Sequence, residues 1–120
     1  MPFMLSKVST KMTEAQEREI KARLGQAISL IPGKSEAYLL CGFEDNYHLY
    51  LRGENDAPIA YITVSIFANE RHIGNDALFA AITDAFQAVL GIDPDRVYIK
   101  YDDIAVWGVC GRAIDRSDFQ

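Results

Sequence analysis

Proline stands at position 2, directly after the initiator methionine. The enzyme that removes this methionine accepts small second residues, so its action would leave Pro2 with a free secondary amine. A free α-amino group has a pKa of about 7.7 to 8.0, which burial or a nearby cation lowers by disfavouring the charged form. An amine poised near neutrality is an effective general base. Pro2 is therefore the first candidate for acid/base chemistry, although proline also follows the initiator for processing reasons alone.

Other residue types that often carry chemistry are sparse. Cys41 and Cys110 are far apart and form neither a C-x-x-C redox motif nor half of a zinc site, so we expect buried, inert thiols. The two histidines, His48 and His72, are well separated and lack a cluster of further ligands. We therefore expect no metal and no organic cofactor.

Pro2 can act as a base only if an ordered element holds it, and the chain begins with such an element. Residues 2–8 are mostly apolar and predict a strand. Thr13 and Gln16 form a capping box that opens an amphipathic helix, which Pro32 ends. The first half is thus predicted to contain a helix at 13–31 and strands at 2–8, 37–43 and 47–51.

The second half repeats this order. Pro58 opens an apolar strand, a polar loop follows at 69–74, and Gly91 ends a helix whose apolar residues keep helical spacing. The predicted elements are a helix at 76–90 and strands at 58–67, 97–101 and 106–110.

Two tandem β-α-β units predict one α/β (α+β) domain over residues 1–120, in which a four-stranded mixed sheet carries both helices on one face. The strand at 58–67 is largely apolar on both sides, so the uncovered face is not built for water either. A bare, partly apolar face predicts oligomerisation. The short strands at 47–51 and 106–110 are then expected to pair with sheet edges of neighbouring subunits.

Composition and charge narrow the classes of function. The chain has 120 residues, of which 49% are hydrophobic and 24% charged, as in globular domains. Its net charge of -5 offers no basic stripe for a phosphate backbone, so nucleic acid is not an expected partner. No signal peptide and no apolar run of about 20 residues is found. We expect no membrane association and a cytoplasmic location, with secretion without a signal peptide as an alternative.

The run at 94–101, PDRVYIKY, resembles the fourth-strand signature of the macrophage migration inhibitory factor family, within the tautomerase superfamily. The likeness extends to Pro2, to Gly33-Lys34 followed by Tyr38, and to Ser65-Ile66. This resemblance implies a homotrimer whose sheets line a barrel, with active sites at the subunit boundaries. It also implies keto-enol tautomerase activity on phenylpyruvate-like 2-oxo acids.

The resemblance implies a role for each matching residue. Pro2 matches the base that moves a proton between the enol oxygen and the neighbouring carbon of the substrate. Lys34 matches the lysine that binds the substrate carboxylate, and the backbone N–H of Ile66 matches a second donor to that group. Tyr98 and Lys100, which point to one face of a strand, would come from a second subunit. The implied substrate-binding residues are Lys34, Tyr38, Ser65, Ile66, Tyr98, Lys100 and Trp107.

Two departures from the family pattern bear on the substrate. Lys100 stands where the mammalian factor has asparagine, and a second cation would hold a carboxylate more strongly and favour a dicarboxylate, unless Lys100 simply reaches solvent. The family's aromatic rim is missing at Val109. Trp107 either replaces part of that rim or packs at a subunit contact, so strong binding of aromatic substrates does not follow from the likeness.

Several alternatives remain open. A signalling or interaction protein would bind a receptor through the trimer surface. Its tautomerase activity would then be only a remnant of its ancestry. A structural relative with an inactive pocket would also fit the altered tail. Related families use arginines and histidines for dehalogenation or decarboxylation, but a mobile, solvated loop equally explains Arg71-His72. A solvated tail is predicted from the charged residues Arg112, Asp115, Arg116 and Asp118.

Overall fold

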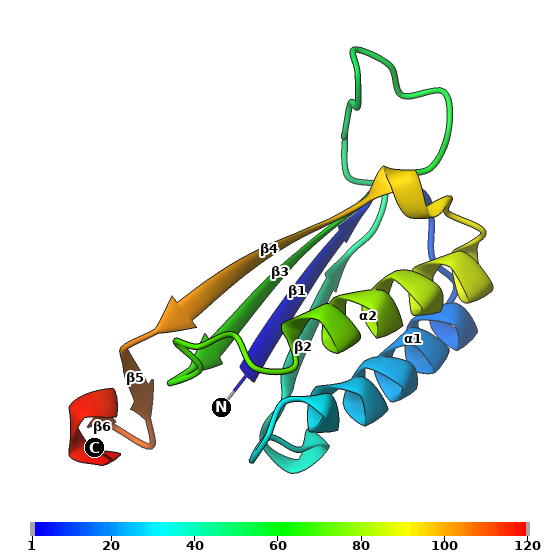
Figure 1. The fold of residues 1–120 in the computed structure, drawn as a ribbon. Coiled ribbons are helices and arrows are strands. Elements are labelled where there is room, and N and C mark those ends of the chain that lie inside the picture. Colours follow the sequence, from blue (N-terminus) through cyan, green and yellow to red (C-terminus); the bar gives the residue numbers. More distant parts are fainter. Residues whose placement is uncertain (1, 120) are drawn as a thin grey trace.

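The computed structural model describes residues 2–119, which form two α-helices and six strands (Figure 1). In chain order these are β1 (Pro2–Val8), α1 (Glu14–Ala27), β2 (Leu40–Glu44), β3 (Ala60–Phe67), α2 (Asn75–Leu90), β4 (Val97–Ile104), β5 (Val106–Val109) and β6 (Arg112–Asp115). Short 3-10 turns lie at Ile28–Leu30, Glu36–Tyr38, Pro94–Arg96 and Arg116–Phe119. Within the described residues, neither helix has the length and apolar character that crossing a membrane requires.

Strands β1 to β4 form one mixed sheet in the order β2-β1-β3-β4. β1 is parallel to β2 and β3 is parallel to β4, whereas the central pair, β1 and β3, is antiparallel. Each parallel pair is joined through a helix, and Figure 1 shows both helices on the same face of the sheet. The predicted pair of β-α-β units and the predicted helical layer are thus confirmed.

The core lies between the helices and the sheet, because alternate residues of each strand point to that side. Burial alternates along the whole of β1 and along most of β3. The fully buried strand residues include Met4, Val8, Ile62, Val64 and Ile66. They share one cluster with helix residues that include Ile20, Leu24, Leu78, Ile82 and Phe86. One continuous apolar layer therefore holds the helices to the sheet.

The opposite face of the sheet carries no helix (Figure 1). The strand register places Leu40, Phe3, Ser65 and Asp102 in one row across it. Leu40 is 63% exposed and Tyr98, on the same face, is 49% exposed. Large apolar side chains open to water on a sheet face favour contact with another subunit.

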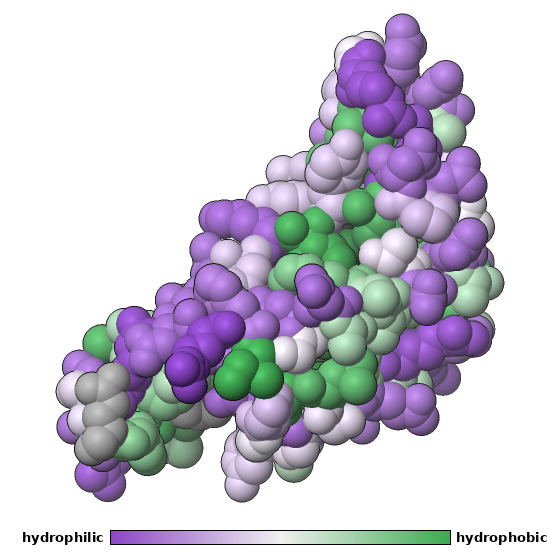
Figure 2. Space-filling model, in the orientation of Figure 1, coloured by the Kyte–Doolittle hydropathy of each residue, from purple (hydrophilic) through white to green (hydrophobic). Residues whose placement is uncertain are grey.

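The strand predicted at 47–51 is not formed. Between β2 and β3 the described chain makes a loop with one isolated bridge, which joins Leu51 to Glu54. Asn46 has a φ of 52° and Arg52 a φ of 54°, and such left-handed conformations interrupt an extended strand. This loop projects from the end of the sheet (Figure 1), and its surface is mainly hydrophilic (Figure 2). The strand predicted from residue 37 likewise starts only at Leu40, because the residues before it form a 3-10 turn.

The C-terminal residues form a hairpin that was not predicted. β5 pairs antiparallel with β6, and Val109 lies opposite Arg112. The connecting residues Cys110 and Gly111 have φ values of 55° and 76°, as a type I′ turn requires. The strand predicted at 106–110 therefore finds a partner in its own chain, and its pairing with a neighbouring subunit stays a prediction.

Replacing Thr13 by alanine should lower the free energy of unfolding by about 1 kcal/mol. The Thr13 hydroxyl accepts a 3.1 Å hydrogen bond from the backbone N–H of Gln16, so its loss leaves that helix N–H without a partner. Urea unfolding at one fixed protein concentration measures the change. Ser35→Ala is the control, because Ser35 precedes a 3-10 turn without a side-chain capping bond. Equal losses in the two variants would contradict the capping role.

Candidate active site

Pro2 occupies the first position of β1 and is buried. Its partner across the sheet is Ile66 of β3, whose own partner in β4 is Asp103. Proline lacks a backbone N–H, but the first residue of a strand need not donate a hydrogen bond to the sheet. The Pro2 ring is therefore held at the end of a central strand. Met1, whose removal the predicted base requires, lies outside the described residues.

Lys34 is brought to the same end of the sheet. It follows α1, and its Nζ donates a 2.8 Å hydrogen bond to the backbone carbonyl of Phe67, the residue after Ile66. Burial lowers the pKa of Lys34, and the nearby Asp103 carboxylate opposes this shift. A partly desolvated ammonium attracts an anion more strongly than one in bulk water. Lys34 is thus placed to bind an anionic group near Pro2.

Asp103 carries an ion pair that was not predicted from the sequence. Its Oδ1 accepts a 2.8 Å hydrogen bond from the backbone N–H of Asn69, and its Oδ2 contacts Nη1 of Arg116. The same guanidinium nitrogen lies 3.0 Å from Oε2 of Glu70. The Arg116 side chain is only 23% exposed, so its assignment to a solvated tail is wrong.

Asn69 anchors the loop at 69–74. The side chain of Asn69 bonds to the backbone of Ile73 at 3.2 and 3.3 Å and to the side chain of Asn75 at 3.3 Å. The ring of His72 meets that of Tyr101 edge to face, with 5.2 Å between the centroids. Arg71 and His72 are nevertheless exposed, which agrees with the solvated loop that was predicted.

Tyr98 and Lys100 share one face of β4, as predicted, but it is the face opposite the helices. Along β4, Tyr98 lies roughly 16 Å from Asp103, at about 3.3 Å per residue. Lys100 Nζ lies 3.6 Å from Oδ1 of Asp102 in its own chain. Within one chain these residues stand apart from Pro2, so their contribution from a second subunit stays a prediction.

The remaining predicted site residues are spread over different elements. Tyr38 is 72% exposed in the turn after Lys34, Ser65 faces Asp102 across the sheet, and Trp107 pairs with Ile114 in the hairpin. Among the described residues, none of the three forms a hydrogen bond or ion pair with Lys34. Within one chain, Pro2, Lys34 and Ile66 thus lie at one end of the sheet. The other predicted site residues lie away from them.

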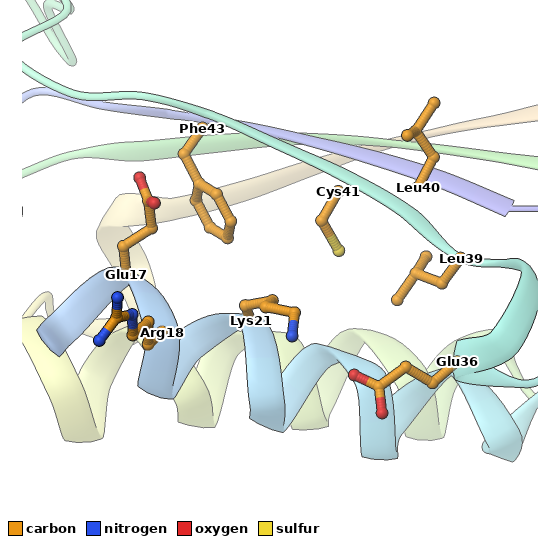
Figure 3. Close-up of a pocket in the computed structure, with 8 residues that line it drawn as sticks. All are labelled: Glu17, Arg18, Lys21, Glu36, Leu39, Leu40, Cys41 and Phe43. Atoms are coloured by element: carbon orange, nitrogen blue, oxygen red, sulfur yellow. The ribbon is translucent and has the colours of Figure 1, made fainter. Parts of the chain in front are cut away.

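A groove between α1 and the edge strand β2 is an alternative site (Figure 3). Cys41 and Phe43 point from β2 toward α1, which contributes Lys21 to the groove. Burial raises the pKa of the Cys41 thiol to about 11, and Glu36 adds to the shift. The thiol is protonated near neutral pH and is a poor nucleophile. The Pro2 end of the sheet therefore remains the candidate active site.

Comparison with protein families agrees with this geometry. The model of the macrophage migration inhibitory factor (MIF) family matches residues 1–113. The chain belongs to this family. None of the curated proteins matches the sequence of this MIF family member at a significant level.

Solved structures share the MIF fold. Leishmania major MIF2 superposes with a TM-score of 0.87 at 24% identity, over 95% of this chain and 97% of that one. A structure described as Pt0534 inactivated by 2-oxo-3-pentynoate gives 0.82 at 16% identity, over 98% of both chains. Another, described as a Q0 fused 4-OT wild type symmetric trimer, gives 0.81 at 22% identity, over 96% of both. The family resemblance and the fold are confirmed, and a homotrimer fits these relatives.

Cys110 of this MIF family member should react with Ellman's reagent faster than Cys41. Cys110 is exposed, which contradicts the expectation of two buried thiols, whereas Cys41 is half-buried with a pKa of about 11. At mildly alkaline pH the native protein should show a fast and a slow phase. Cys110→Ser should remove the fast phase and Cys41→Ser the slow one. Equal rates for the two thiols would contradict the environment described for Cys41.

Proposed function

We propose that this MIF family member is a cofactor-independent keto-enol tautomerase that acts on phenylpyruvate-like 2-oxo acids as a homotrimer. The observation that carries the proposal is the position of Pro2, buried at the start of a central strand at the sheet end that Lys34 reaches. A potential base and an anion-binding cation thus occupy one site. Pt0534 shares the fold and is inactivated by 2-oxo-3-pentynoate, a 2-oxo acid, which supports the substrate class.

The proposed reaction needs one base and a fixed substrate. With Met1 removed, the Pro2 nitrogen takes the proton of the enol hydroxyl and delivers a proton to the neighbouring carbon, so the keto form appears without net proton exchange. The Lys34 ammonium and the backbone N–H of Ile66 hold the substrate carboxylate during the transfer. A fixed carboxylate keeps the reacting carbon within reach of Pro2, which reduces the entropy lost at the transition state.

Residues of a neighbouring subunit would complete the proposed site. Tyr98, Lys100 and Trp107 are the candidates, because they lie away from Pro2 in their own chain. Lys100 already has Asp102 as a partner at 3.6 Å, so its charge is shared before any substrate binds. A monocarboxylate therefore suits the site better than the dicarboxylate that Lys100 alone suggested. We also propose a cytoplasmic location for the trimer.

Pro2→Gly should lower kcat/KM for enol-to-keto conversion of phenylpyruvate by at least about tenfold, because glycine provides a primary amine without the ring that fixes its position. Conversion is followed spectrophotometrically, with the N-terminus of each protein confirmed by intact mass. Pro94→Gly, at an exposed turn, is the matched control and should retain activity. Wild-type protein that lacks Met1 and shows no activity on this or on smaller 2-oxo acids would reject the tautomerase proposal, leaving an interaction protein or an inactive relative.

Lys34→Gln should raise KM by about tenfold or more and change kcat less, because a charge-assisted hydrogen bond to the carboxylate contributes about 1.5 to 3 kcal/mol to binding. Steady-state kinetics with phenylpyruvate measure both constants. The matched control is Lys11→Gln, since Lys11 is exposed in the turn before α1. A loss confined to kcat would show that Lys34 does not bind the ground-state carboxylate.

A further inference from the structure

Arg116 reaches back from the C-terminal 3-10 turn to the end of the sheet that carries Pro2. Its Nη1 contacts the Asp103 carboxylate and lies 3.0 Å from that of Glu70. Its backbone N–H donates a 2.8 Å hydrogen bond to the carbonyl of Ala105, which fixes the start of the turn. These contacts place a guanidinium beside two carboxylates close to the proposed substrate site.

The Asp103 carboxylate poses an electrostatic problem for that site. Asp103 stands in the same row of the sheet as Ile66 and Pro2, and its side chain is only 17% exposed. It precedes Ile104, which lies opposite Phe67. The Phe67 carbonyl accepts the hydrogen bond of Lys34, so the negative charge of Asp103 lies near the Lys34 ammonium. Left alone, this carboxylate would both hold the Lys34 ammonium and repel the carboxylate of a substrate. Asp103 also holds the backbone N–H of Asn69, so the loop after β3 depends on it.

The C-terminal turn has a second link to Lys34. The ring of Phe119 packs edge to face against that of Phe67, with 6.0 Å between the centroids. Phe67 is the residue whose carbonyl accepts the Lys34 hydrogen bond and whose ring lies 5.9 Å from the Lys34 ammonium. The turn at 116–119 therefore contacts Asp103 through Arg116 and contacts Phe67, the residue that binds Lys34, through Phe119.

We infer that Arg116 is a positioning residue for carboxylate binding: its guanidinium neutralises Asp103, which leaves the Lys34 ammonium free for the carboxylate of the substrate. This inference rests on the proposed function, because it concerns the same site. Arg116 itself need not touch the substrate. By pairing with Asp103, it lets the Asp103 carboxylate hold the loop at 69–74. Asp103 then does not compete with the substrate carboxylate for the Lys34 ammonium.

The inference predicts that KM rises as the net charge of residues 103 and 116 becomes more negative. Arg116→Gln leaves Asp103 unopposed and should raise KM for phenylpyruvate roughly three- to tenfold, with a smaller change in kcat. Asp103→Asn in the same protein restores a neutral pair and should return KM toward the wild-type value. Arg116→Lys keeps the charge and should resemble wild type. Arg18→Gln is the control, because Arg18 forms a surface ion pair that is about three-quarters exposed.

Two further readouts do not depend on turnover. The pKa of Lys34, followed by NMR of 13Cε-labelled lysine, should be highest in Arg116→Gln, intermediate in wild type and the double variant, and lowest in Asp103→Asn alone. The affinity for hydrocinnamate, a non-reactive aromatic carboxylate, should fall in Arg116→Gln and recover in the double variant. Thermal unfolding and size-exclusion chromatography confirm that each variant remains folded and assembled.

The outcomes separate this inference from the proposed function. If Arg116→Gln leaves the Lys34 pKa and hydrocinnamate affinity unchanged, or if Asp103→Asn fails to restore them, Arg116 is only an anchor of the C-terminal turn and the inference is overturned. If wild type has no tautomerase activity but the pKa and affinity series hold, the proposed function fails while the electrostatic role of Arg116 stands.

Discussion

The antiparallel pairing of β1 with β3 is the constraint on which the rest of the structure depends. Every other pairing of the main sheet lies within one β-α-β unit, so this is the strand pair that joins the two units, beside the packing of α1 against α2. It runs from Pro2 opposite Ile66 to Val8 opposite Ala60. A register shift of one residue would turn the buried face of β1 away from the helices. The apolar core thus determines where Pro2 stands relative to Ile66.

The end of β1 and β3 that carries Pro2 and Ile66 needs both a negative and a positive side chain. Local order requires a carboxylate, because Asp103 holds the backbone N–H of Asn69. Binding of an acidic substrate requires positive potential, which Lys34 supplies from the segment after α1. Arg116 reconciles these demands by pairing with Asp103 from the far end of the chain. The site is thus a balance of fixed charges on a sheet end, and no single charged residue defines it.

Hydrophobic periodicity was enough to predict the two β-α-β units, because the core residues of β1, β3, α1 and α2 follow the repeats of strand and helix. It failed where apolar residues do not face the core. Residues 47–51 alternate like a strand, but Asn46 and Arg52 turn the chain on both sides. The hairpin of β5 and β6 was missed because its turn is Cys110-Gly111, whereas asparagine or aspartate usually marks the type I′ turn.

The site residues could be predicted only in part. Pro2, Lys34 and Ile66 were identified through the family pattern, and their proximity agrees with it. Arg116 was missed because its partners lie elsewhere in the sequence, Asp103 within β4 and Glu70 after β3, and no spacing rule connects them.

The distance between Pro2 and Arg116 along the sequence has a consequence for how the protein is made. Pro2 opens β1 and Arg116 lies in the turn after β6, yet Arg116 pairs with Asp103, which stands in the same row of the sheet as Pro2. A site that needs both residue 2 and residue 116 stays incomplete until Arg116 has left the ribosome. Shortened chains that still fold around the central strands would present Lys34 beside an unopposed Asp103, so they would have the architecture without the charge balance.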